Sequence, residues 1–74
     1  MASISETVGR RVKALRAKRC PQESARQFAR RAGVHYVQLN RIEQGHATPQ
    51  LDTLERIAQA LDLPLPDLLT DGAA

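Results

Sequence analysis

The sequence predicts a compact, all-α domain of five helices that spans residues 1–74. Apolar residues recur at the i, i+4, i+7 spacing of one helix face, and proline or glycine separates the periodic segments. Residue types that favour strands are scarce, with one Phe, one Tyr and no Trp in the chain. A single cysteine cannot form an internal disulfide, so an aliphatic core has to hold the fold.

The first helix is predicted at residues 3–19. Either Ser3 or Ser5 can cap its start. Pro21 stops it, because proline disfavours helical geometry in the preceding residue. Its inward face carries one apolar residue per turn, at Val8, Val12 and Leu15.

Two short helices with a glycine between them follow, at residues 24–32 and 35–44. Ser24 and Gln27 form a capping box at the start of the first, and Gly33 supplies a left-handed cap at its end. Another glycine ends the second helix. Two helices joined by such a turn form a helix-turn-helix, in which the second helix lies in the major groove of DNA.

The fourth and fifth helices are predicted at residues 50–61 and 65–69, and residues 70–74 are expected to fray. Either Thr48, with a proline after it, or Gln50 can cap the fourth helix. The inward face of this helix is predicted to hold Leu51, Leu54, Ile57, Ala58 and Leu61.

Charge is divided between the two halves of the chain. Residues 1–41 carry ten arginines and lysines against two glutamates, a net charge of +8. Residues 42–74 carry one arginine against six acidic residues, a net charge of −5. A basic half beside an acidic half is typical of a protein that docks one face on a polyanion. Charged residues that merely solvate helix surfaces explain this asymmetry about equally well.

The sequence holds no catalytic, metal-binding or membrane-spanning motif. Ser-His-Asp sets, glycine-rich phosphate loops and paired carboxylates are missing, so we expect neither an enzyme nor a cofactor. His35 and His46 lie eleven residues apart with no third ligand nearby, so no metal site is expected. The apolar runs are too short for a membrane span, and no apolar signal region precedes the domain. We therefore expect a cytoplasmic protein without membrane contact.

Five stretches carry a family resemblance, in chain order: RVKALR at 11–16, FARRAGV at 28–34, RIEQG at 41–45, PQLDTL at 49–54 and LDLPLPDLL at 61–69. Together they resemble the helix-turn-helix domain of the lambdoid phage repressor and Cro family, also called the XRE family. The resemblance covers most of the chain and implies a lambda-repressor-like fold in which helices two and three form the helix-turn-helix. Most members of that family bind palindromic operators as homodimers.

The resemblance also implies that the exposed start of the helix at 35–44 touches base edges. Val37 can pack on a thymine methyl group, and Arg41 can bind O6 and N7 of guanine with two hydrogen bonds. Tyr36 can donate to a base or a phosphate, and Gln38 can read adenine or hold a phosphate. Polar side chains that simply face solvent are the alternative.

Contacts to the DNA backbone are predicted to depart from the family pattern. Ala25 stands where the family usually has a phosphate-binding glutamine after the cap of helix two. The loop after Gly45, often basic in the family, has no arginine or lysine. A solvated histidine in that loop and a packed or capping histidine at position 35 are the competing interpretations. The predicted backbone contacts are Gln22, Arg26, His35, Asn40, His46 and Thr48.

Two structural features follow from the same resemblance. Arg16 and Glu43 match an ion pair that ties helix one to the end of helix three, so Glu43 is expected to be scaffold. A dimer interface is expected on the fifth helix, although some of its leucines must also close the core. A monomer that dimerises only on DNA is the alternative. The predicted interface residues are Leu63, Leu65, Leu68 and Leu69.

Two functions of different class fit these residues. The first is a sequence-specific, double-stranded DNA-binding transcriptional regulator, which binds a pseudo-palindromic operator as a homodimer and resides with the nucleoid. The second is an antitoxin-type module that binds a partner protein such as a toxin, because a fold alone does not fix function. The polar, arginine-bearing face of residues 35–44 favours the first, since a partner-binding helix usually shows more apolar surface.

Overall fold

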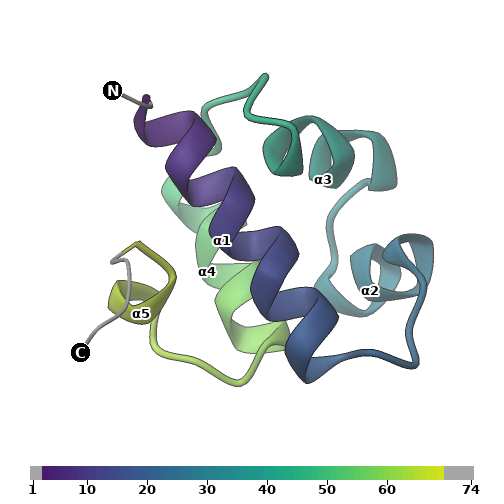
Figure 1. The fold of residues 1–74 in the computed structure, drawn as a ribbon. Coiled ribbons are helices and arrows are strands. Elements are labelled where there is room, and N and C mark those ends of the chain that lie inside the picture. The colour runs from purple at the N-terminus through teal and green to yellow at the C-terminus, as the bar shows by residue number, and fades with distance from the viewer. Residues whose placement is uncertain (1–2, 70–74) are drawn as a thin grey trace.

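The computed structural model describes residues 3–69, which form five α-helices without a strand (Figure 1). The predicted all-α class is therefore confirmed, and the tail at 70–74 lies outside the described residues. Helix α1 runs through the middle, with α2 and α3 on one side and α5 on the other (Figure 1). The helices are α1 (Ile4–Arg19), α2 (Ala25–Ala32), α3 (Tyr36–Glu43), α4 (Leu51–Ala60) and α5 (Leu65–Leu69).

Helices α1 and α2 both begin with a capping box. The Ser3 hydroxyl accepts a hydrogen bond from the Glu6 backbone N–H, and the Glu6 carboxylate accepts one from the Ser3 N–H, each at 3.1 Å. Ser24 and Gln27 form the same reciprocal pair at 3.1 and 2.8 Å. The cap residues themselves have extended backbone geometry, so each helix begins one residue later than the sequence predicts.

Helices α3 and α4 begin without a side-chain cap. His35 and Gln50 occupy the N-cap positions, and neither side chain bonds to the first turn. Thr48, the other candidate cap of α4, instead shares a hydrogen bond of 2.9 Å with the Ser5 hydroxyl on α1. The first backbone N–H groups of α3 are therefore open to an external acceptor.

Helices α2, α3 and α4 end in the same way. In each, the first or second residue after the helix adopts a left-handed conformation, and the next N–H bonds to the carbonyl five residues back, at 2.9–3.0 Å. The left-handed residues are Gly33, Gly45 and Asp62, with φ angles of 79°, 76° and 60°. Asp62 is the one residue other than glycine with positive φ in the described part of the chain.

The core takes one face from every helix. Its largest fully buried side chains are Val12, Phe28, Leu39, Ile42, Ile57, Leu61 and Leu68. Apolar burial of this kind is the main force that holds such a small domain together.

Helix α1 meets the end of α3 at a glycine. A Cβ atom on Gly9 would overlap the carbonyl oxygen of Ile42, so the two backbones touch at this point. A glycine in the interior of a helix is unfavourable by roughly 1 kcal/mol relative to alanine. Here the contact between the two backbones leaves no space for a larger residue. Gly9 thus sets how deeply α3 sits in the molecule.

Candidate nucleic-acid interface

One side of helix α3 is buried in the core, and the other side faces outward. Leu39 and Ile42 are fully buried, whereas Val37 is 67% exposed and Arg41 is exposed. Val37 and Arg41 are four residues apart, so they lie one above the other on the outward face. Gln38 is half-buried beside them. The outward face thus carries one apolar and two polar side chains that can reach a ligand.

A hollow of about 440 Å³ lies on this outward face of α3. We call it the α3 hollow. It contains three of the four predicted base-reading residues together with His35 and a residue of the loop after α3, and its lining residues are His35, Val37, Gln38, Arg41 and Ala47. The structure therefore brings together residues from the N-cap of α3, from the helix itself and from the loop that follows it.

Tyr36 lies elsewhere. It is half-buried against the core, and the guanidinium of Arg26 from α2 stacks over its ring at 4.3 Å from the ring centre. This distance is typical of a cation–π contact. Tyr36 therefore sits beside α2 rather than in the α3 hollow with the other predicted base-reading residues.

A second hollow of about 250 Å³ lies between α2 and the start of α3. We call it the α2–α3 hollow. Arg26 and Arg30 are exposed on successive turns of α2 and line it, and neither forms an ion pair within residues 3–69. The imidazole of His35 and the uncapped N-terminus of α3 face the same region. Two cations beside a helix N-terminus form an environment that can hold a phosphate.

Other arginines are engaged within the fold. Arg31 donates two hydrogen bonds of 2.8 Å to Glu23, which raises the pKa of Arg31 and lowers that of Glu23. Burial raises the pKa of the neighbouring Cys20 thiol. Three more arginines donate to backbone carbonyls: Arg11 to Asp67, Arg19 to Leu61 and Arg56 to Gly33.

Arg16 and Glu43 join α1 to the end of α3. Nε and Nη2 of Arg16 donate to the two carboxylate oxygens of Glu43 at 2.7 and 3.0 Å. The side chains are only 15% and 6% exposed, and the hydrogen bonds to Glu43 raise the pKa of Arg16. Such a two-pronged pair fixes orientation as well as charge. It orients α3 rather than serving as an acid or a base.

The other four predicted backbone residues line neither of these two hollows. Asn40 is half-buried and accepts a hydrogen bond of 3.5 Å from Gln44. His46 is exposed in the loop after α3, next to Ala47. Thr48 is exposed and bonded to Ser5. Gln22 is exposed in the α1–α2 turn, near the Glu23–Arg31 pair.

The predicted dimer surface needs correction at Leu68. This side chain is fully buried, because α5 folds onto α1 and α4 and uses it to close the core. It is not available to a partner. Leu63 and Leu65 are half-buried, and Leu69 is 38% exposed.

Two further exposed apolar side chains lie beside Leu69. Ile4 is 73% exposed and Leu51 is 69% exposed, although Leu51 is predicted to face inward. Both belong to the first turn of a helix, and in both helices this turn extends beyond the end of the core. With Pro49 they border a hollow of about 210 Å³, and we call Ile4, Leu51 and Leu69 the apolar patch.

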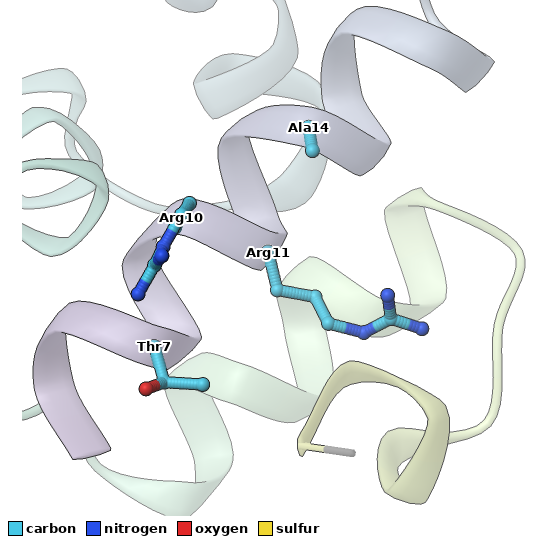
Figure 2. A pocket seen from close by; sticks show the side chains of 4 residues that line it. All are labelled: Thr7, Arg10, Arg11 and Ala14. Atoms are coloured by element: carbon cyan, nitrogen blue, oxygen red, sulfur yellow. The ribbon is translucent and has the colours of Figure 1, made fainter. Parts of the chain in front are cut away.

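A further hollow, of about 290 Å³, is formed by the outer face of α1 alone (Figure 2). Thr7, Arg10, Arg11 and Ala14 line it, on the side of the helix opposite Gly9. In Figure 2, Arg11 reaches toward α5, where it donates to the Asp67 carbonyl at 2.9 Å, whereas Arg10 points away from it. Because Gly9 faces α3, this hollow lies on the other side of the molecule from the two hollows of the helix-turn-helix.

Residues 3–69 contain neither a candidate metal site nor a candidate membrane span. Within this range no three His, Cys, Asp or Glu side chains come together in a way that could hold a metal ion. No helix in the same range has the length and apolar character needed to cross a bilayer.

Comparisons with known proteins agree with this geometry. The profile of the helix-turn-helix family HTH_3 matches residues 13–68. The competence regulator ComR from Streptococcus vestibularis, in its apo form, is 38% identical with a TM-score of 0.79. That match covers 90% of this chain but 22% of ComR, so the chain spans about a fifth of that protein's length. No curated protein sequence matches the chain.

Two smaller solved proteins share the fold. The clp gene regulator ClgR from C. glutamicum has a TM-score of 0.83 at 22% identity, covering 92% of this chain and 85% of ClgR. The restriction-modification controller protein C.AhdI from Aeromonas hydrophila has a TM-score of 0.78 at 23% identity, covering 86% and 94%. The family match extends over most of the chain and includes both helices of the helix-turn-helix. The chain therefore belongs to the XRE family of helix-turn-helix proteins, which are DNA-binding transcriptional regulators and not enzymes.

Proposed function

We propose that this protein is a sequence-specific regulator that lays α3 in the major groove of double-stranded DNA. One observation carries the proposal: the base-reading side chains of the α3 hollow lie beside the unpaired cations of the α2–α3 hollow. Base contacts specify a sequence and phosphate contacts position the protein, and both are needed side by side. Such a protein works in the cytoplasm, at the nucleoid.

On this proposal three side chains of α3 contact the bases, each suited to a different base. Arg41 is exposed and forms no ion pair within residues 3–69, so its guanidinium is free to bind O6 and N7 of a guanine. Gln38 presents an amide that suits adenine N6 and N7. Val37 offers the apolar surface that suits a thymine methyl group.

Phosphate binding falls mainly to Arg26, with Arg30 and His35 beside it. The ring of Tyr36 holds the Arg26 guanidinium next to the start of α3, which limits the entropy lost when a phosphate binds. Arg26 thereby takes the place of the glutamine that relatives carry at the position of Ala25. Side chains at the edges of the surface add weaker contacts, and they are Gln22, Asn40, His46 and Thr48.

Specific binding on this scheme requires two copies of the chain. The eight residues of α3 extend about 12 Å, which spans only three or four base pairs. So short a site recurs too often in a genome to direct regulation, whereas a two-fold dimer reads two half-sites about 34 Å apart on a pseudo-palindrome. Leu69, with the rest of the apolar patch and the half-buried Leu63 and Leu65, offers a surface to the second copy.

The dimer is expected to form mainly on DNA. The apolar patch is small, and stable dimers bury well over about 1,200 Å². Sedimentation velocity of the free protein should therefore show a monomer at micromolar concentration, and addition of operator should give two protomers per duplex. A single protomer per duplex at saturation would contradict the dimer while leaving DNA binding intact.

The decisive experiment selects bound duplexes from random DNA and then compares two arginine variants. Arg41→Ala should lower operator affinity by at least tenfold and relax selection at one position per half-site, because a bidentate arginine discriminates by roughly 1–3 kcal/mol. Arg10→Ala removes the same charge from the opposite face of α1 and should leave the selected sequence unchanged. Wild-type protein that enriches no sequence would refute the regulator.

The apolar patch also fits a partner protein, which supports the antitoxin-type module as a second candidate. In that case the selection enriches no sequence, and Ile4→Glu abolishes binding to the partner. Under the regulator proposal the same substitution weakens only the assembly of two protomers on one duplex. The two candidates therefore give opposite results in the selection step.

A further inference from the structure

The outer face of α1 carries three cations, which we call the basic face of α1: Arg10, Arg11 and Lys18. Lys18 follows Arg11 by two helical turns, so both lie on the same side of the helix, and Arg10 lies beside Arg11. None of the three forms an ion pair within residues 3–69. The one acidic residue of α1, Glu6, accepts a hydrogen bond from the Ser3 N–H in the capping box. The basic face is therefore left without a counter-charge.

This basic face is hollowed toward the start of the helix. The hollow of about 290 Å³ in Figure 2, which we call the α1 hollow, is lined by Thr7, Arg10, Arg11 and Ala14. Its wall thus combines the methyl groups of Thr7 and Ala14 with the side chains of two arginines. A ligand that complements both has an apolar stem and an anionic tip. Among protein side chains, glutamate has this form.

The guanidinium of Arg11 is oriented before a ligand arrives. Its Nε donates to the Asp67 carbonyl of α5 at 2.9 Å, and the residue is half-buried. A guanidinium has further N–H donors in a rigid fork, which match the two oxygens of a carboxylate. Because the fork is already held, less side-chain entropy is lost when a carboxylate binds. In Figure 2, Arg10 points away from α5, so it can meet a second carboxylate.

We propose that the basic face of α1 is a docking surface for an acidic segment of a second protein, and that the α1 hollow receives a glutamate of that segment. The carboxylate of this glutamate binds Arg11, and neighbouring acidic residues bind Arg10 and Lys18. Arg11 and Lys18 are about 10 Å apart along the helix axis, the rise of two turns. An acidic helix laid along α1 can present carboxylates at the same interval.

A nucleic acid complements this surface less well. A phosphodiester group belongs to a continuous backbone and has no apolar stem that can enter the α1 hollow. The hollow also lies on the side of α1 opposite Gly9, where α3 packs, so a duplex bound along α3 leaves it open. The proposal therefore does not depend on the proposed DNA-binding function, and the two can be tested separately.

The probe is a fluorescein-labelled, alanine-based helical peptide with a glutamate on each turn of one face. Fluorescence anisotropy should show that the wild-type protein binds it more tightly than the same peptide with glutamine in place of glutamate. Lys18→Ala and Arg10→Ala should each weaken binding about threefold, as expected for exposed ion pairs. Lys13→Ala removes the same charge from an exposed position of α1 outside the basic face and should change the affinity by less than about twofold.

Ala14→Leu tests the hollow itself. It fills the space with a larger side chain without changing any charge, and leucine is a good helix former, so the fold is expected to persist. Affinity for the glutamate peptide should fall by at least about fivefold. Ala17→Leu makes the same change at an exposed position that does not line the hollow, and it should bind within about twofold of the wild type. Circular dichroism checks that both variants are folded.

Four results would each overturn the docking surface. They are equal binding of the glutamate and glutamine peptides, unchanged binding in Ala14→Leu, equal losses in Lys13→Ala and Lys18→Ala, and displacement of the peptide by saturating operator DNA. Displacement would place the peptide on the DNA-binding face instead. A second duplex that binds the operator complex and loses affinity in Lys18→Ala would assign the basic face to nucleic acid. Failure of the wild-type protein to select any DNA sequence would refute the proposed function alone.

Discussion

Asp62 occupies the left-handed position that glycine takes at the ends of α2 and α3. Its φ of 60° closely matches the 79° and 76° of Gly33 and Gly45. A side chain in this conformation strains the backbone, although aspartate tolerates it better than most residues. The negative charge also lies at the C-terminal end of α4, where the helix dipole disfavours it. Two physical terms at Asp62 therefore oppose stability.

Asp62→Gly is expected to stabilise the domain by about 0.5–1 kcal/mol and to raise Tm by a few degrees. The opposite substitution, Gly33→Ala, should destabilise it by about 1 kcal/mol through φ alone, because a Cβ there meets no atom within 4 Å. Urea titration monitored by circular dichroism measures both. A destabilised Asp62→Gly would mean that the aspartate makes a contribution that outweighs its backbone strain.

Gly45 differs from Gly33 in what surrounds it. A Cβ on Gly45 would lie 2.9 Å from Cγ of Glu6, whereas Gly33 faces open space. The sequence shows only that both glycines follow a helix, and the αL conformation of both was predictable from that. The close approach of Glu6 to Gly45 was not predictable, because Glu6 belongs to α1 and is far from Gly45 in the sequence.

At the scale of the element, α3 depends on α1 for its depth and orientation. The two helices touch through Gly9, and the Arg16–Glu43 pair ties them together farther along α1. A shift of α3 would displace all the side chains on its outward face at once. The position of α3 is therefore set by residues that lie away from this outward face.

Gly9→Ala should destabilise the domain by at least about 1 kcal/mol, because the overlap with the Ile42 carbonyl exceeds the gain in helix propensity. It should also lower operator affinity, since α3 has to move outward. Ala14→Gly, on the exposed side of α1, changes helix propensity alone and should lower the free energy of unfolding by about 1 kcal/mol. It should leave operator affinity unchanged under conditions in which the variant is fully folded. A stabilised Gly9→Ala would show that the two helices can separate without penalty.

The order and type of the elements were predictable because their signals are local. Capping residues, apolar spacing and glycine at helix ends all lie within one helix or just beyond it. The Arg16–Glu43 pair was accessible only through the family resemblance. The contact between Arg26 and Tyr36 was not predictable, because it joins two different helices. The apolar spacing within one helix does not reveal which side chain of another helix an aromatic residue will contact.

Apolar spacing was a poor guide at the ends of helices. It placed Leu51 inside, but the first turn of α4 extends beyond the core and leaves this side chain 69% exposed. It left Leu68 available to a partner, whereas the short α5 needs that residue to close the core. In both cases the position of the other helices decides burial, and spacing along one helix carries no information about it.

At the scale of the whole molecule, the basic half of the sequence is divided between scaffold and surface. Arg11, Arg16, Arg19 and Arg31 all bond to carboxylates or carbonyls inside the fold. The arginines that line the helix-turn-helix hollows, Arg26, Arg30 and Arg41, form no ion pair within residues 3–69. The number of arginines and lysines in residues 1–41 therefore overstates how many cations can neutralise phosphates.

Operator affinity should accordingly depend only moderately on salt. Each neutralised phosphate contributes about 0.9 to the slope of log K against log salt. Arg26→Ala should reduce this slope by about one unit per protomer, whereas Arg10→Ala, on the far face of α1, should leave it unchanged. Tyr36→Phe retains the ring under Arg26 and should retain the slope and the selected sequence. If Tyr36→Phe instead alters the selected sequence, the tyrosine hydroxyl reads a base and the grouping of Tyr36 with Arg26 is wrong. An unchanged slope in Arg26→Ala would place the phosphate clamp elsewhere on the molecule.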